Sequence, residues 1–194
     1  MKIKYNPNKY NKDKYTLKSH NCYAYVLNKK SKKNIEKCKE KKGKHCLRPQ
    51  VGNFKTDVVK EYYYPSIEKK RTRMITCPRL KEKIKTDNPN ISFIKRKCNH
   101  KDNYQGIVFN VEKSKKDKKY YDYHFYRRDD NGYWSHKYGI DKATNKMDNN
   151  NDEFIKNPKL DMNDYCNNRN YKCKFCSYLC IPRDSRKKRM KIKY

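Results

Sequence analysis

The sequence predicts a single domain of the α+β class, in which a short N-terminal helix packs on a small antiparallel sheet. Three observations predict this class. A run of helix formers follows Asn21 in the stretch SHNCYAYVLN. Two stretches rich in β-branched and aromatic residues, GIVFNVEK (106–113) and YYDYHFYRR (120–128), are typical of neighbouring strands. No Gly/Ser-rich linker or repeat divides the 194 residues, so we expect one domain over residues 16–182.

The expected helix begins at Asn21 or Ser19, either of which can cap its first turn through a side-chain oxygen. Ala24 and Leu27 continue the helix, so Cys22 lies in the first turn. The positive end of a helix dipole lowers the pKa of a thiol there, and a nearby imidazolium lowers it further. The pattern therefore predicts an activated Cys22 thiol.

The stretch DYHFYRRDDNGYWSHK is predicted to form a β-hairpin. On its first strand Asp122, His124 and Tyr126 share one face. A two-residue Asn-Gly turn would put His136 on the opposite face. A type I turn followed by Gly132 in the left-handed region, which makes a G1 bulge, puts His136 on the face of His124, one diagonal step away. Because the segment DDNG fits the second turn, we expect the bulged hairpin.

Before residue 16 and after residue 182 the chain is basic, and we expect tails at residues 1–15 and 183–194, the first with little to bury. The formal net charge of +31 favours a polyanionic partner, such as nucleic acid, an anionic membrane surface or an anionic wall polymer. Lysine outnumbers arginine, and Lys, Asn, Ile and Tyr are enriched together, as A/T-rich codons would also produce. No secretory signal and no stretch long enough to span a membrane are visible.

Nine cysteines leave several states open. They can form four disulfides and one free thiol, bind zinc, or stay reduced. The C-terminal cluster could hold zinc, or it could pair with the cysteines nearer the N-terminus. The cluster consists of Cys166, Cys173, Cys176 and Cys180, and the other candidates are Cys38, Cys46, Cys77 and Cys98.

The segments HNCYAYVLN, DYHFYRRDDNGYWSHK and FCSYLCIP together resemble a group of large-DNA-virus and bacterial proteins similar to the NlpC-type branch of the papain-like cysteine hydrolases. The resemblance covers mainly residues 16–28 and 104–182. It implies a papain-like fold with Cys22 as nucleophile, His124 as base and His136, 12 residues later, as the orienting group. No cofactor and no metal is implied at this site.

Two details of the implied site stay open. Asp122 competes with His136 as the orienting group, because it shares the strand face of His124. The Cys22 backbone N–H is the expected oxyanion donor, helped by a side chain further upstream, with Tyr10, Tyr15 and His20 as candidates.

The leading expectation is therefore a cysteine hydrolase of a large DNA virus, an amidase or peptidase that passes through an acyl-enzyme on Cys22. Its expected location is the virion or the viral factory in the host cytoplasm. The alternative is a non-enzymatic, highly basic virion or nucleic-acid-associated structural protein on the same fold. Its affinity for DNA would fall steeply with salt.

Overall fold

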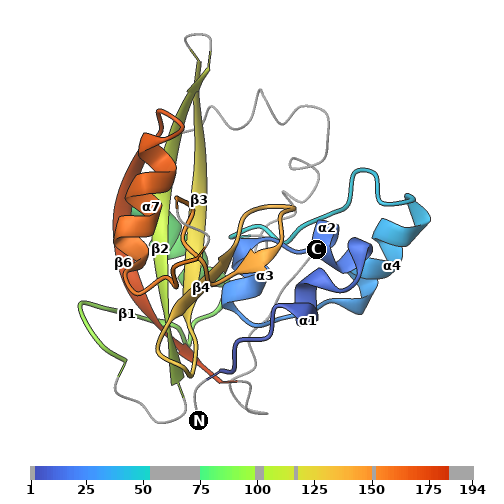
Figure 1. Cartoon of the computed structure of the whole chain (residues 1–194), viewed down its shortest axis with the longest axis horizontal. Coiled ribbons are helices and arrows are strands. Elements are labelled where there is room, and N and C mark those ends of the chain that lie inside the picture. The colour runs from blue at the N-terminus through green and yellow to red at the C-terminus, as the bar shows by residue number, and fades with distance from the viewer. Residues whose placement is uncertain (1–2, 53–74, 99–102, 116–117, 150–151, 184–194) are drawn as a thin grey trace.

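A computed structural model describes residues 3–52, 75–98, 103–115, 118–149 and 152–183 of the chain. Its centre is a six-stranded antiparallel sheet with the strand order β1-β6-β2-β3-β4-β5. Helices lie on both sides of this sheet (Figure 1). The predicted α+β class is thus confirmed.

The two strands predicted from their β-branched and aromatic residues are both present, and each is longer than expected. They form the long antiparallel pair β2 and β3. The strands are β1 (Ser92–Ile94), β2 (Asn103–Lys115), β3 (Lys118–Arg128), β4 (Trp134–Lys137), β5 (Ala143–Thr144) and β6 (Lys172–Pro182).

Most of the helices begin at a side-chain cap, which contributes about 1 kcal/mol to the stability of each one. Asn21, Ser31, Thr76 and Asn157 each accept a hydrogen bond from a backbone N–H of the first turn that follows. The helices are α1 (Asn8–Asn11), α2 (Lys14–Ser19), α3 (Cys22–Val26), α4 (Lys32–Glu40), α6 (Cys77–Asp87) and α7 (Pro158–Asn167).

The alternation of side chains along the strands gives the sheet a core on each face. On one face, Leu80 and Ile84 of α6 join α3 and the buried Phe125 of β3. On the other, Met162 of α7 packs with the buried Tyr126 of β3. The sheet is therefore the middle layer of three, and α3 and α7 contact opposite faces of it.

The turn between β3 and β4 has the predicted bulged geometry. The Asp129 N–H donates to the Tyr133 carbonyl at 2.9 Å, and the Gly132 N–H donates to the Asp129 carbonyl at 3.1 Å. Gly132 has a φ of 89°, which L-residues rarely adopt. Tyr126 consequently pairs with His136, as the bulged hairpin requires.

The N-terminal residues differ from the expected basic tail. Residues 8–11 form α1, Tyr10 is buried against Tyr25, and the Ile3 carbonyl accepts a hydrogen bond from the Asp130 N–H at 2.9 Å. The expectation that residues 1–15 have little to bury is therefore wrong, because their aromatic and aliphatic side chains complete the core around α3. Of the expected C-terminal tail, residues 184–194 lie outside the described part of the chain.

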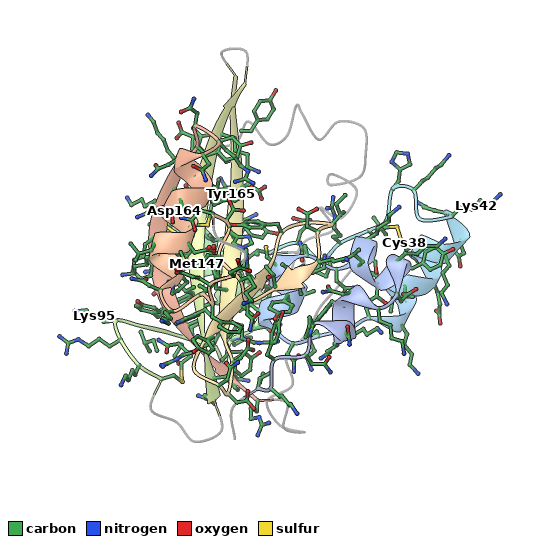
Figure 2. All side chains as sticks on the ribbon, in the orientation of Figure 1. Cys38, Lys42, Lys95, Met147, Asp164 and Tyr165 are labelled. Carbon is green, nitrogen blue, oxygen red and sulfur yellow. A yellow bond between two sulfur atoms is a disulfide. The ribbon has the colours of Figure 1, made fainter. Side chains whose placement is uncertain are left out.

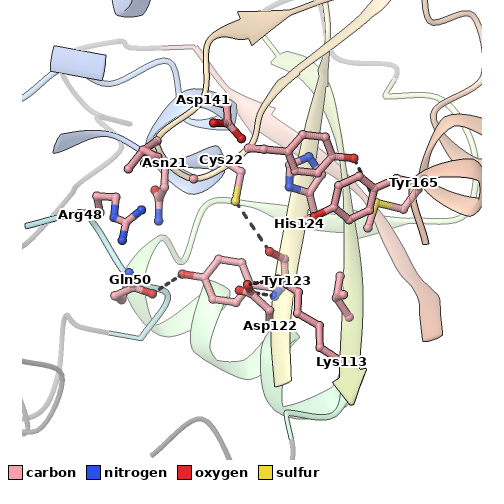
Figure 3. A pocket seen from close by; sticks show the side chains of 15 residues that line it. Asn21, Cys22, Arg48, Gln50, Lys113, Asp122, Tyr123, His124, Asp141 and Tyr165 are labelled. Atoms are coloured by element: carbon pink, nitrogen blue, oxygen red, sulfur yellow. Dashed lines mark hydrogen bonds and ion pairs between the residues drawn. The ribbon is translucent and has the colours of Figure 1, made fainter. Parts of the chain in front are cut away.

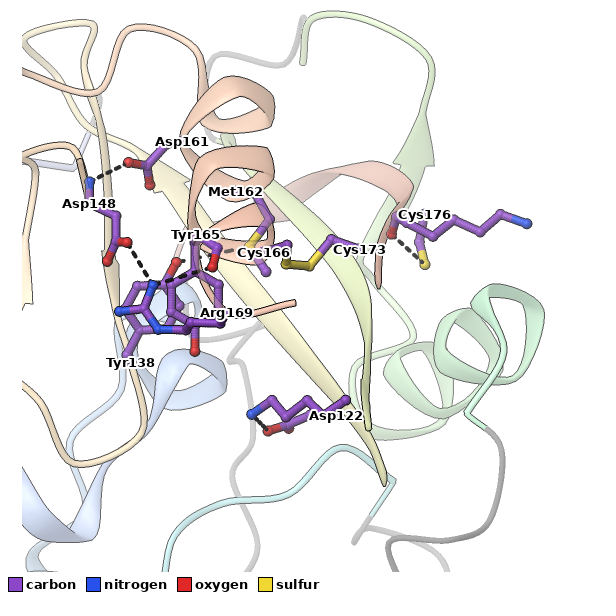
Figure 4. The surroundings of a disulfide bond; sticks show 12 residues. Asp122, Tyr138, Asp148, Asp161, Met162, Tyr165, Cys166, Arg169, Cys173 and Cys176 are labelled. Carbon is purple, nitrogen blue, oxygen red and sulfur yellow. Dashed lines mark hydrogen bonds and ion pairs between the residues drawn. A yellow bond between two sulfur atoms is a disulfide. The ribbon is translucent and has the colours of Figure 1, made fainter. Parts of the chain in front are cut away.

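All nine cysteines lie in the described residues, and eight of them form disulfides: Cys38–Cys46, Cys77–Cys176, Cys98–Cys180 and Cys166–Cys173. Figure 4 shows the Cys166–Cys173 bridge, which ties α7 to β6. The disulfide alternative is thus the one the structure has, and the zinc and reduced-thiol alternatives for the C-terminal cluster do not hold. Cys22 alone is free.

Two features of the surface bear on partners. Residues 29–44, which we call the basic head, contain nine lysines and two glutamates, and most of their side chains are exposed. The head protrudes beside the sheet, with Lys42 at its far end and the Cys38–Cys46 bridge at its base (Figure 2). Within the described residues, no helix has the length and apolar character needed to cross a membrane.

Candidate functional site

Cys22 is the first residue of α3, and the local sequence fixes it there. The Asn21 side chain accepts a hydrogen bond from the Ala24 N–H at 3.2 Å and donates one to the Pro49 carbonyl at 2.6 Å. The first bond caps the helix, and the second holds the cap against the segment that follows the basic head. As a result Cys22 lies buried at a fixed point beside the sheet, with 5% of its surface exposed.

The Cys22 sulfur lies against the edge of β3. β4 pairs with β3 only at Tyr126 and the two residues after it, so β4 does not cover the preceding stretch of that edge. The sulfur lies at this uncovered stretch of β3. Cys22 Sγ is 3.8 Å from the Tyr123 carbonyl oxygen and also interacts with the Phe125 backbone N–H. These two residues flank His124, so the thiol contacts the backbone on both sides of the expected base.

His124 and His136 are in direct contact. His124 Nε2 and His136 Nδ1 are 2.9 Å apart, and both rings are buried. The G1 bulge produces this contact, because it sets His136 opposite Tyr126 and therefore diagonal to His124 on the same face. The structure brings the two histidines together as the sequence predicted.

Four further side chains hold the two imidazole rings in place. His124 stacks on Tyr138 with ring centroids 4.1 Å apart, and His136 stacks on Tyr126 at 4.6 Å. The Tyr126 hydroxyl donates to the buried Asp161 carboxylate at 2.8 Å. Tyr138 stacks in turn on Tyr165 (4.2 Å), so α7 supports the pair from outside.

Neither the Tyr138 stack nor the Asp161 contact was found from the sequence. Tyr138 comes two residues after His136 in the sequence. This spacing is the signal that could have placed Tyr138 near the two histidines. Asp161 lies in a segment with no periodic pattern, and only the packing of α7 brings it to Tyr126.

The hydrogen bond between the histidines decides which nitrogen of the His124 ring has no contact with the partner ring. Among the described residues His124 makes one hydrogen bond, through Nε2, so Nδ1 is the atom left to interact with a thiol or a substrate. If His124 Nε2 donates, then His136 Nδ1 accepts and His136 carries its proton on Nε2, a buried atom with no partner among the described residues. That tautomer leaves a lone pair on His124 Nδ1.

The electrostatics differ from the sequence-based expectation of an activated thiolate. Burial, with a smaller contribution from the Asp122 carboxylate, raises the pKa of the Cys22 thiol to about 12. Burial also lowers the pKa of His124, and it lowers that of His136 to about 3. The prediction of a lowered Cys22 pKa is therefore wrong, because desolvation outweighs the dipole of a five-residue helix. At neutral pH the thiol and both imidazoles are uncharged.

A cavity of about 310 Å³ opens in front of the thiol, and Figure 3 shows Cys22 and His124 side by side on its wall. Its charged residues balance, with Arg48 and Lys113 against Asp122 and Asp141. The other lining residues are Asn21, Cys22, Gln50, Val111, Tyr123, His124, Tyr138, Gly139, Ile140, Met162 and Tyr165.

The Asp122 carboxylate contacts groups other than the His124 ring. One of its carboxylate oxygens pairs with Lys113 Nζ at 3.1 Å, and the other accepts from the Tyr123 N–H at 2.9 Å. His124 Nε2 instead lies within hydrogen-bonding distance of His136 Nδ1. Of the two candidates that the sequence left open, His136 is the one in contact with His124 Nε2.

The expected upstream helper for an oxyanion is not found among the three candidates, none of which lines the cavity. The Tyr10 hydroxyl donates to the Lys29 carbonyl at 2.9 Å. His20 is held by the Thr16 carbonyl and the Ser31 N–H. Gln50, which the sequence did not indicate, does line the cavity, and its Oε1 accepts from the Tyr123 hydroxyl at 2.7 Å.

No group of three or more His, Cys, Asp or Glu side chains suited to hold a metal ion occurs in the part of the chain that the structure describes. No protein-family model matches the chain, and comparisons with curated proteins and with solved structures likewise give no match. The fold and the site therefore define the class on their own: a disulfide-bonded α+β domain with a buried thiol beside a histidine pair.

Proposed function

We propose that the chain is a cysteine hydrolase that cleaves an amide or ester bond, with the arrangement of the NlpC-type papain-like enzymes. Cys22 is the nucleophile, His124 the base and His136 the orienting group. One observation carries the proposal. The single free thiol of nine cysteines lines a cavity together with a histidine whose far nitrogen is bonded to a second histidine.

The uncharged resting state favours general-base catalysis over a preformed ion pair. As Cys22 Sγ attacks the carbonyl carbon, its proton passes to His124 Nδ1, and the carbonyl electron pair moves onto oxygen. The His124 imidazolium is stabilised through Nε2–H by His136 Nδ1. It then returns the proton to the leaving amine or alcohol as the C–N or C–O bond breaks, which leaves an acyl group on sulfur.

Water completes the cycle. His124 takes a proton from a water molecule that attacks the thioester carbon, the C–S bond breaks, and the proton returns to sulfur. The oxyanion of both steps would be met by the Cys22 backbone N–H at the start of α3, where helix N–H groups have no intrahelical acceptor. Gln50 is a second donor, since its Oε1 is taken by Tyr123 and its NH₂ group is left to donate.

The hydrolase proposal is tested with 4-nitrophenyl acetate as a generic acyl donor. We expect the full-length protein to release nitrophenol, and Cys22→Ala and His124→Ala each to lower kcat/KM at least about a hundredfold. Lys85→Met, a change at an exposed lysine of α6 that does not line the cavity, is the matched control and should leave the rate unchanged. Equal rates for Cys22→Ala and the unmodified chain would contradict the proposal.

The second candidate function is a basic, nucleic-acid-associated structural role in a virion, and the basic head favours it. Nine lysines on a disulfide-anchored segment form a positive surface away from the cavity, whose own charges balance. Retention on DNA should then fall steeply with salt, and Lys→Gln changes at Lys32, Lys33, Lys41 and Lys42 should reduce the salt slope. A slope unaffected by these changes would remove the head from that role.

A further inference from the structure

The Cys166–Cys173 bridge lies next to one wall of the candidate site. Cys166 is in the last turn of α7 and packs in the core that contains Tyr126, the residue on which His136 stacks. Cys173 is near the start of β6 and pairs with Val111 of β2, a residue that lines the cavity. The bridge therefore joins a helix and a strand that lie directly beside the cavity and the histidine pair.

Tyr165 connects this bridge to the candidate base. It is the residue before Cys166 and lines the cavity, and its ring stacks on Tyr138 with centroids 4.2 Å apart (Figure 4). Tyr138 stacks in turn on His124 at 4.1 Å. The covalent bond is thus separated from the His124 ring by one neighbouring residue and two ring stacks.

The polar side-chain contact at this end of α7 is a weaker restraint than the bridge. Arg169 pairs with Asp148 at 2.8 Å, but the Arg169 side chain is 41% exposed. An exposed ion pair adds little to stability, because water and salt compete for both partners. Met162, one turn earlier, is buried in the core and holds the middle of the helix. We therefore expect loss of the bridge to loosen the last turn, with Tyr165, while the rest of the helix stays in place.

From this geometry we propose that the site is redox-regulated through the Cys166–Cys173 bridge. With the bridge closed, Tyr165 and Tyr138 fix the His124 ring at the cavity, and with the bridge open they no longer do. Tyr165 is a positioning residue, since it acts on His124 through Tyr138. The inference rests on the proposed hydrolase function for its catalytic meaning, and it makes the chain active where disulfides persist and inactive in a reducing compartment.

Opening of the bridge requires a dithiol reductant. A thiolate of the reductant attacks the Cys173 sulfur, which belongs to a partly exposed residue, and the S–S bond breaks as the buried Cys166 sulfur leaves. The second thiol of the reductant then displaces the Cys173 sulfur from the mixed disulfide. Two electrons pass to the protein, the two protons of the dithiol end on the two cysteines, and the reductant becomes a disulfide.

The first test compares paired serine variants of the full chain. Cys166→Ser/Cys173→Ser removes the bridge, and Cys38→Ser/Cys46→Ser is the matched control, because the two bridges have sequence separations of 7 and 8 and the second lies in the basic head. We expect the first pair to lower kcat toward 4-nitrophenyl acetate about tenfold or more with KM little changed, since a displacement of about 1 Å can slow catalysis about a hundredfold. The control should keep the rate, and equal rates in the two variants would overturn the inference.

A second readout follows the His124 ring without hydrolysis. Protons above an aromatic ring are shielded, so the Tyr138 stack should shift the Cε1–H signal of His124 upfield in the ¹H NMR spectrum. We expect this shift to be lost in Cys166→Ser/Cys173→Ser and in Tyr165→Ala. It should be kept in Tyr165→Phe, whose ring can still stack. A folded serine pair with an unchanged His124 signal would overturn the inference.

If the serine pair does not fold, the same signal is followed in the unmodified chain during titration with dithiothreitol. Acid quenching and differential alkylation then show which of the four bridges are open at each step. The His124 shift should disappear in step with the opening of Cys166–Cys173. Opening without loss of the shift, or no opening before the whole chain unfolds, would overturn the inference. A chain that shows the loss of the shift but no turnover in its oxidised form would contradict the hydrolase proposal alone.

Discussion

His124 Nε2 lies 2.9 Å from His136 Nδ1, and a single inserted residue in the turn between their strands makes this contact possible. Without the bulge, His136 would point to the face of α3 and His124 to the face of α7. The contact occupies Nε2 of His124, and Nδ1 is left to interact with a thiol or a substrate. The candidate site is built around this contact, and both the second histidine and the turn that positions it can be tested by substitution.

Removal of the orienting ring should lower activity more than stability. His136→Ala frees His124 to rotate, so we expect kcat toward 4-nitrophenyl acetate to fall about a hundredfold or more. His136→Asn, whose side-chain oxygen can accept from His124 Nε2, should recover part of the loss. Kinetics of the two variants measure this, and equal losses in both would count against an orienting role.

The turn should depend on Gly132, whose φ is 89°. Space is open around a Cβ at this position, so Gly132→Ala adds backbone strain without a clash, and we expect the free energy of unfolding to fall by about 1 kcal/mol. Gly132→Asn should cost less, because asparagine tolerates the left-handed region better. Urea denaturation of the unmodified chain and of the two variants checks this order of stability. An alanine variant more stable than the unmodified chain would contradict the bulged turn.

The long-range disulfides should contribute more stability than the short one. Cys77–Cys176 spans 99 residues and Cys38–Cys46 spans 8. The chain-entropy model gives a loss of about 4–5 kcal/mol for the paired serine substitutions at the first bridge and about 2–3 kcal/mol at the second. Denaturant titrations of the two double variants test this difference, which would be absent if both bridges only strengthen local packing.

The buried histidines should make folding sensitive to acid. Burial holds the pKa of His136 at about 3 and that of His20 at about 4, below their unfolded value near 6.5. The unfolded chain therefore binds more protons between about pH 6.5 and pH 4, and stability present above that range is lost as the pH falls through it. Each group contributes a slope of up to about 1.4 kcal/mol per pH unit.

Unfolding titrations at pH 7, 6 and 5 should show this loss. His20→Gln should flatten the slope, because His20 lies outside the cavity and its two bonds, to the Thr16 carbonyl and from the Ser31 N–H, can be met by an amide. A slope that is equal in the variant and the unmodified chain would contradict a neutral, buried His20.

Local patterns in the sequence predicted much of the site. The cap at Asn21 predicted where the helix begins, and the segment DDNG predicted the register that places His136 beside His124. The predictions that were wrong concern features that depend on long-range packing. The depth of Cys22, and hence its raised pKa, follows from contacts with β3 about a hundred residues away. The burial of Tyr10 in the expected tail has the same origin.

The balance between the two functions also could not be predicted, because a net charge of +31 does not show where the charge lies. The structure separates the basic head from a cavity with balanced charges, so the two proposed functions would use different surfaces. We therefore expect a change in the cavity to remove hydrolysis and leave DNA binding intact. A change in the basic head should weaken DNA binding and leave hydrolysis intact.

In the proposed mechanism the Cys22 sulfur becomes acylated with the help of His124. Intact mass spectrometry of the native chain, quenched in acid during turnover of 4-nitrophenyl acetate, measures this directly. We expect one acetyl group, mapped to Cys22 and absent in His124→Ala. Acetylation spread over surface lysines, with Cys22 unmodified in the native chain, would contradict it.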